Sequence, residues 1–168
     1  SNINTSMLKI IGMNENLINK YLTNNIFISN DICDNIKIIS GDKNELYEFK
    51  KNIEKLKINN IKFYELNVDG AFHTKYFGKM SDYLENILKN ITYNETNISL
   101  ISNYKNQKYN KENFIHLLKN QVCSKVEWNN IIKLLNKTIK FSCEICVSKS
   151  SLNNLFDINK SNLYSIHI

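Results

Sequence analysis

VDGAFHT, residues 68–74, separates two segments of different character. The run before it, IKFYELNV at residues 61–68, is typical of a strand, and the run after it, YFGKMSDYLENILKN at residues 76–90, has helical spacing. His73 therefore lies in the connection from a strand to a helix, where a scaffold presents side chains to a cleft. Imidazole is suited to proton transfer near neutral pH. A single histidine in such a connection is nevertheless more often a surface or packing residue.

The residues before this stretch predict a small unit with the element order β-α-β-β-α-β. Short apolar runs are the predicted strands, at residues 6–11, 26–29, 36–40 and 61–68. Polar residues 31–35 predict the turn of a hairpin between the second and third strands. This order is the ferredoxin-like pattern, and we expect a ferredoxin-like small subdomain over residues 1–67.

Two amphipathic helices connect these strands. Asn14 can cap the first helix, and Gly41-Asp42 is expected to break the third strand and cap the second helix. Apolar residues follow each cap at the spacing of one helix face. They are Leu17, Ile18, Tyr21 and Leu22 in the first helix, and Leu46, Phe49, Ile53 and Leu56 in the second.

The residues after 74 alternate between predicted helices and predicted strands. Three helices carry apolar residues at helical spacing: Met80, Tyr83, Leu84, Ile87 and Leu88; Phe114, Leu117 and Leu118; and Trp128, Ile131, Ile132 and Leu135. Strands are expected at residues 99–102, 139–145 and 163–168, with a further helix at residues 150–156. This alternation predicts a parallel sheet, but one with fewer strands than a doubly wound sheet needs.

The composition limits the class of partner. The 168 residues carry a formal net charge of +6, and all 22 basic residues are lysines. A positive charge is typical of a protein with an acidic partner, although a lysine-rich codon bias would give the same excess. The lysines are scattered and no aromatic and arginine residues interleave, which argues against nucleic acid. No apolar run has transmembrane length and no signal peptide opens the chain, so we expect a soluble protein.

Four cysteines offer no complete metal site. Cys143 and Cys146 form a C-x-x-C pair, but no second pair or neighbouring histidine completes a zinc set. The pair also lies within a predicted strand rather than at the start of a helix, where redox pairs usually lie. We expect Cys33, Cys123, Cys143 and Cys146 to be buried, reduced thiols, and we expect no metal.

Five segments, taken in chain order, resemble the malonyl-CoA:acyl carrier protein transacylases. They are TSMLKIIGM at residues 5–13, NDICDNIKIISG at 30–41, DGAFHT at 69–74, Ser102-Asn103, and NQVCSKVEW at 120–128. The first resembles the opening strand of the family's small subdomain, and the second its hairpin that ends in Ile-Ser-Gly. The third resembles the segment around the active-site histidine. The last is similar to a Gln-Leu-x-x-Pro-Val-x-Trp motif, and the resemblance runs over nearly the whole chain.

The chain also departs from the family pattern. Phe77 stands where a methionine is usual, Lys125 where a proline is usual, and Thr74 where a serine is commoner. Residues 146–148, Cys-Val-Ser, replace a Gly-Pro-Gly turn. The nucleophile elbow Gly-His-Ser-Leu-Gly, the glutamine of the oxyanion loop and the carboxylate-binding arginine have no counterpart; all three lie upstream in family members. Since no glycine here flanks a serine as G-x-S-x-G, the chain resembles the C-terminal half of such an enzyme.

The resemblance implies a fold and a role for each of three residues. It implies an α/β chain with the ferredoxin-like subdomain at residues 1–67 and the C-terminal part of an α/β-hydrolase-like acyltransferase subdomain at residues 68–168. His73 would be the general base that activates the serine of the missing half. The backbone carbonyl of Gln121 would orient His73, and Phe72 would exclude the α-methyl homologue of malonyl-CoA.

The resemblance further implies malonyl transfer to the phosphopantetheine thiol of an acyl carrier protein in fatty acid biosynthesis. The substrate would be malonyl-CoA, no cofactor would be needed, and the partners would be the carrier protein and the missing N-terminal half. Two other interpretations stay open: a stand-alone ferredoxin-like binding module with an inert His73, and an acyltransferase domain of a modular synthase. The compartment is expected to be a plastid-type organelle or the cytoplasm.

Overall fold

The computed structural model describes residues 4–140, 142–146, 155 and 163–167. The chain forms two compact units, Ser1–Trp128 and Asn129–Ile168. The expected subdomain boundary between residues 67 and 68 lies inside the first unit and stays a prediction. The mixed α/β class predicted from the sequence is confirmed by the elements described below.

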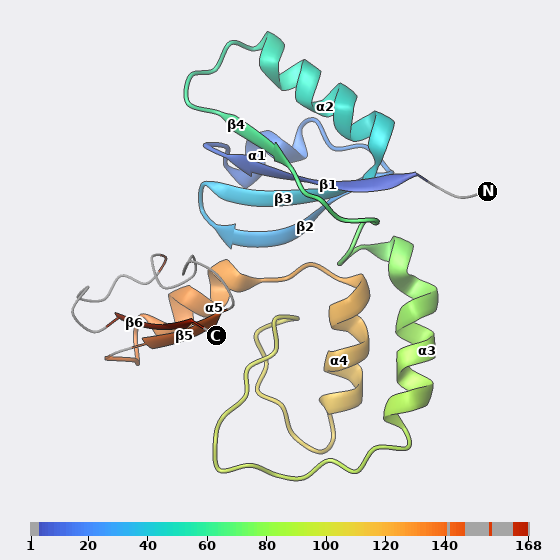
Figure 1. Ribbon diagram of the computed structural model, residues 1–168, viewed down its shortest axis with the longest axis vertical. Coiled ribbons are helices and arrows are strands. Elements are labelled where there is room, and N and C mark those ends of the chain that lie inside the picture. The colour runs from blue at the N-terminus through green and yellow to red at the C-terminus, as the bar shows by residue number, and fades with distance from the viewer. Residues whose placement is uncertain (1–3, 141, 147–154, 156–162, 168) are drawn as a thin grey trace. The chain divides into compact units, whose positions relative to one another are not determined.

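The first unit begins with an open antiparallel sheet of four strands, in the order β2-β3-β1-β4 (Figure 1). Its elements follow the chain order β1 Thr5–Ile11, α1 Glu15–Asn19, β2 Ile26–Cys33, β3 Ile36–Asp42, α2 Lys43–Lys55 and β4 Lys62–Glu65. Each neighbouring pair of strands is antiparallel. This is the predicted β-α-β-β-α-β order with the ferredoxin-like strand arrangement.

Local capping and one shared core explain these elements. The Asn14 side chain accepts a hydrogen bond from the Leu17 amide at 2.9 Å, and Asp42 caps α2 in the same way at Asn44 and Glu45. Both helices and the sheet contribute to one apolar cluster. Its buried members are Leu8, Ile10, Met13, Ile18, Ile26, Ile39, Leu46, Phe49 and Ile53. Leu56 was expected to join them but is 41% exposed, because it lies at the C-cap where α2 ends.

The β2–β3 hairpin corrects two expectations. Residues 31–33, expected in the turn, extend β2, because Asp31 forms a buried ion pair with Lys37 of β3 at 2.7 Å. Gly41, expected to break β3, continues it and pairs with both Ser6 and Ile26. A Cβ at Gly41 would overlap the carbonyl oxygen of Asn25, so close backbone approach explains this glycine.

Two helices follow the sheet within the first unit. The 3₁₀ turn η1 Lys75–Phe77 leads into α3 Gly78–Leu88, which lies beside α4 Phe114–Cys123 (Figure 1). Ser81 Oγ donates to the Lys119 carbonyl at 2.8 Å, and Lys119 forms an ion pair with Glu85 at 2.6 Å. Much of the predicted apolar face of α3 is exposed: Met80, Tyr83 and Ile87 are 51%, 63% and 42% exposed, whereas Leu88 is buried.

The strand expected at residues 99–102 is absent from the described part of the chain. Ile101 makes a single antiparallel bridge to Lys108, and Leu100 is 48% exposed. A strand needs a neighbour along its length to satisfy its amide and carbonyl groups. Here that neighbour is one bridge long, which explains why an apolar run did not become a strand.

The second unit holds most of α5 Trp128–Leu135, which begins at the last residue of the first unit, and two parallel strands, β5 Ser142–Cys146 and β6 Leu163–His167. The predicted helix, the two strands and their parallel pairing are confirmed. The helix expected at residues 150–156 falls outside the described residues, apart from residue 155. Cys143 is exposed and Cys33 and Cys123 are partly exposed, so these thiols are free but not buried as expected.

Candidate active site

The connection after β4 is attached to the first strand of the sheet. The Leu66 amide donates to the Met7 carbonyl at 3.0 Å. The Ala71 amide donates to Thr5 Oγ1 at 3.1 Å, and Ala71 is fully buried. Thr5 is the first residue of β1, so the segment that carries His73 is fixed to the start of this interior strand by a bond across 66 residues.

A tight turn presents His73. Its backbone φ is +59°, in the left-handed region that most residues avoid and that histidine enters more readily than most. Thr74 Oγ1 closes the turn by donating to the Ala71 carbonyl at 2.6 Å, and it also accepts from the Tyr76 amide at the start of η1. Because both bonds need only a hydroxyl, Thr74 can do here what the commoner serine would do.

The His73 ring contacts the end of α4. Its Nδ1 lies 2.7 Å from the backbone carbonyl oxygen of Gln121. A carbonyl can only accept, so Nδ1 carries the hydrogen and donates it. In the neutral ring the other nitrogen, Nε2, then holds a lone pair and can accept a proton. The turn and the helix end together select the tautomer that a general base needs.

The position of Gln121 explains why its carbonyl is available. α4 ends at Cys123, and the last four carbonyls of a helix have no intrahelical partner. Gln121 is among them, so its carbonyl can accept from His73 without breaking a helical bond. The C-terminal end of a helix also carries partial negative charge, which stabilises a nearby cation.

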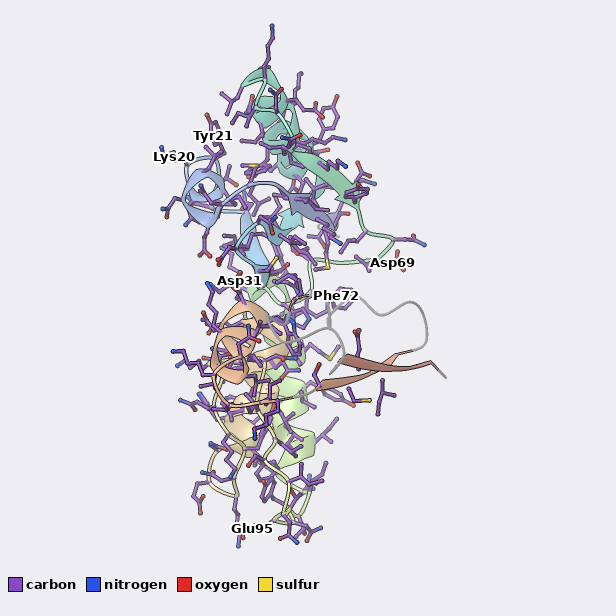
Figure 2. All side chains as sticks on the ribbon, turned by 90° about the vertical axis from the view of Figure 1, so that its left-hand side faces the viewer. Lys20, Tyr21, Asp31, Asp69, Phe72 and Glu95 are labelled. Carbon is purple, nitrogen blue, oxygen red and sulfur yellow. The ribbon has the colours of Figure 1, made fainter. Side chains whose placement is uncertain are left out.

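Phe72 precedes His73 and lies partly open to solvent. Its side chain is 38% exposed, and its ring stacks on Phe77 with centroids 4.6 Å apart. Figure 2 shows Phe72 in the connection between the sheet and α3, at the level of Asp31. The aromatic Phe77, which departs from the family pattern, thus packs directly against the Phe72 ring. The two rings form an apolar surface next to His73 instead of contributing to the core.

The structure therefore brings together His73 and Gln121, the two residues named for catalysis, and Phe72 directly precedes His73 in the chain. Their roles in a reaction stay predictions. Sequence reasoning missed Tyr109, whose hydroxyl lies 3.3 Å from Gln121 Oε1. No motif marks Tyr109, because it comes from a loop of polar residues and the contact forms only in the folded chain. Among the described residues, no group of three or more metal-binding side chains comes together.

Two known proteins with similar sequences carry the same activity in their names. No family model matches the chain. It is 31% identical over 155 residues to the malonyl CoA-acyl carrier protein transacylase of Buchnera aphidicola, covering 89% of this chain and 49% of that protein. It is 32% identical over 98 residues to the polyketide biosynthesis malonyl CoA-acyl carrier protein transacylase BaeC of Bacillus velezensis, covering 58% of this chain and 34% of that protein.

The chain is a homologue of the malonyl CoA-acyl carrier protein transacylases. It spans a third to a half of the length of these relatives. The fold agrees: the Helicobacter pylori transacylase matches with a TM-score of 0.80 at 20% identity, covering 99% of this chain and 54% of that one. The Clostridium perfringens transacylase matches with a TM-score of 0.77 at 22% identity, covering 98% and 53%. The resemblance predicted from the ordered motifs is thus confirmed.

Proposed function

We propose that this transacylase homologue supplies the general base for malonyl transfer from malonyl-CoA to the thiol of an acyl carrier protein. The serine nucleophile comes from a segment outside these 168 residues, because no G-x-S-x-G is present in them. The observation that carries the proposal is the 2.7 Å bond from His73 Nδ1 to the Gln121 carbonyl. It leaves Nε2 as the proton acceptor.

The proposed reaction has two halves that use His73 in turn. In the first, Nε2 takes the proton of the serine hydroxyl as its oxygen attacks the thioester carbon of malonyl-CoA. The carbon–sulfur bond breaks, and the coenzyme A thiolate takes the proton from His73. In the second, His73 takes the proton of the carrier's phosphopantetheine thiol, whose sulfur attacks the malonyl ester, and returns it to the serine oxygen.

Gln121 stabilises this cycle through its main chain. When His73 is protonated, the Nδ1–H bond to the carbonyl persists and becomes charge-assisted, which strengthens it. The ring therefore keeps its orientation in both protonation states. In a Ser-His-Asp triad the carboxylate orients the histidine; here we propose that the Gln121 backbone carbonyl does so.

Phe72 is proposed to select malonyl over methylmalonyl groups. Its partly exposed ring, fixed by the stack on Phe77, lies one residue from the base. A methyl group on the α-carbon of the substrate would then meet an aromatic wall. Discrimination of this kind is graded, about 10- to 200-fold for one methyl-sized group.

The partners proposed are malonyl-CoA, an acyl carrier protein and the segment that carries the serine. A polyketide acyl carrier protein forms a solved complex with its malonyl-transacylase among the structures that share this fold. The named relatives include polyketide enzymes as well as the Buchnera transacylase, so carriers of fatty acid or polyketide synthesis both fit. The proposed chemistry needs no cofactor. In the described residues no helix could span a membrane, and we propose a plastid-type organelle or the cytoplasm as the site of action.

The test combines two preparations. The 168-residue chain alone, incubated with radiolabelled malonyl-CoA, is expected to acquire no covalent label. The complete reading frame around the chain, co-expressed if it is split, is expected to become labelled on one serine and to pass the label to a carrier protein. Stable label on a serine of the chain alone would contradict the assignment of the nucleophile. A complete protein that folds but never becomes labelled would favour the binding-module interpretation.

A further inference from the structure

The side chain of Gln121 is held independently of its carbonyl. The Tyr109 hydroxyl lies 3.3 Å from Gln121 Oε1 and 3.2 Å from Ser102 Oγ. A phenol has one hydrogen, and the amide oxygen can only accept. The arrangement that satisfies both contacts has Tyr109 donating to Gln121 and the Ser102 hydroxyl donating to Tyr109. Ser102 Oγ also accepts from the Tyr104 amide at 3.1 Å, so a backbone bond holds the hydroxyl in place.

The loop that carries Ser102 and Tyr109 is held by backbone hydrogen bonds. Ser102 is 1% exposed, its amide donates to the Gln107 carbonyl at 2.9 Å, and the Tyr109 amide donates to the Leu100 carbonyl at 2.9 Å. These two bonds close a loop whose tip, Lys105 and Asn106, has positive φ values of 59° and 54°. Tyr109 is therefore held by backbone bonds on a closed loop, not by a free side-chain contact.

The same loop is hydrogen-bonded to the short segment between α4 and α5. The Glu127 amide donates to the Asn103 carbonyl at 2.9 Å, and Asn106 Nδ2 donates to Glu127 at 3.2 Å. Val126 in turn forms a bridge with Asn30, and its backbone bonds to Ser29 and Asp31 of β2 are both 2.8 Å. The last turn of α4 thus lies between two fixed points: the Tyr109 hydroxyl on one side and the β2 edge after it.

We infer that Tyr109 is a positioning residue for His73. It holds the Gln121 side chain, and through it the backbone carbonyl that keeps the hydrogen on Nδ1. Ser102 in turn orients the Tyr109 hydroxyl. The inference rests on the proposed function, since the orientation of His73 matters for catalysis only if His73 is the base. The contacts themselves lie within the first unit and are open to measurement without catalysis.

The expected effect of losing the hydroxyl is modest and specific. Tyr109→Phe keeps the ring and removes only the bonds to Gln121 and Ser102. A typical hydrogen bond changes an equilibrium by about 2- to 12-fold. We therefore expect the ratio of the Nδ1–H to the Nε2–H tautomer of His73 to fall by about 2- to 12-fold, with faster exchange of the Nδ1 hydrogen.

The measurement is ¹⁵N NMR of the His73 ring in the 168-residue chain, where the two nitrogens report the tautomer directly. The matched control is Tyr104→Phe, the same chemical change on the same loop, because the Tyr104 ring lies against His116. We expect the control to leave the His73 signals unchanged. A Tyr109→Phe chain that folds and shows the wild-type tautomer ratio would refute the inference.

A second variant separates positioning from general loosening. Gln121→Leu removes Oε1 but keeps the backbone carbonyl, so it should shift the tautomer ratio in the same direction. If Tyr109 acts through Gln121, the double variant should show no more than the larger of the two single effects. Additive shifts, or a wild-type ratio in Gln121→Leu, would overturn the proposed route. A confirmed tautomer shift together with an inactive complete protein would reject the proposed function alone.

Discussion

Replacing His73 is the sharpest test of the proposed reaction, and the backbone determines which replacement to use. Because His73 has a φ of +59°, alanine would add strain to the turn, whereas asparagine enters the left-handed region readily. His73→Asn therefore removes the imidazole while the turn is kept. His73→Ala serves as the companion variant, with the same chemical loss and more strain.

The structure separates the expected loss of stability from the expected loss of rate. His73 contributes one hydrogen bond, to Gln121, and a typical bond contributes about 0.5–1.5 kcal/mol. That is small against a domain stability of about 5–15 kcal/mol, so the fold should persist. Loss of a general base usually slows the chemical step by about 10²–10⁴-fold. The rate effect should therefore far exceed what partial unfolding could cause.

The assay is pre-steady-state acylation by radiolabelled malonyl-CoA in the complete protein that carries the serine. Circular dichroism and thermal melting verify the fold of each variant. His116→Asn makes the same side-chain change at an exposed histidine of α4 and should acylate at the wild-type rate. If His73→Asn is folded and acylates as fast as wild type, His73 is not the base and the proposed mechanism is wrong.

Four further predictions test other parts of the structure. Phe72→Ala should raise kcat/KM for methylmalonyl-CoA relative to malonyl-CoA by up to about 10- to 200-fold, and an unchanged ratio in a folded variant would remove Phe72 from substrate selection. Asp31→Asn leaves the buried Lys37 charge without its partner at 2.7 Å and should lower the unfolding free energy in urea by about 3–5 kcal/mol, a loss that Lys37→Met in the same chain should partly restore. The hydrogen bond from Lys119 lowers the pKa of Glu85 from its ordinary value of 4.5, so this pair stabilises the fold above about pH 4.5 and the contribution fades as the pH falls below it; Glu85→Gln should flatten that part of the stability curve. Transfer to the carrier protein should slow as salt rises through about 0.10–0.15 M, where exposed charges are screened over about 8–10 Å, and a flat rate would assign the lysine excess to codon bias.

The sequence predicted those features that depend on neighbours a few residues apart. Asn14 and Asp42 cap their helices because a cap needs only an oxygen two or three residues before the amides it accepts from. The alternation of short apolar runs and amphipathic helices was enough for the ferredoxin-like order. The family motifs also located His73, since the residues of that segment are contiguous.

Features that depend on distant partners were decided by the tertiary structure. The apolar run at residues 99–102 had the composition of a strand, but the fold offered only one bridge, to Lys108. The face of α3 that includes Tyr83 had the periodicity of a buried stripe, but it is exposed in the described fold. Periodicity states which residues share a face, and only packing states whether that face is covered.

The site shows the same division. The resemblance named His73 and Gln121, which are 48 residues apart, but only the folded chain shows that Nδ1 meets the one kind of backbone carbonyl that a helix leaves unpaired. Tyr109 had no signal in the sequence, because a hydroxyl in a polar loop is indistinguishable from its neighbours until the loop closes. The sequence thus named the residues that we propose for the chemistry. The tertiary structure determined which nitrogen of His73 keeps the proton, because that depends on the position of an acceptor in space.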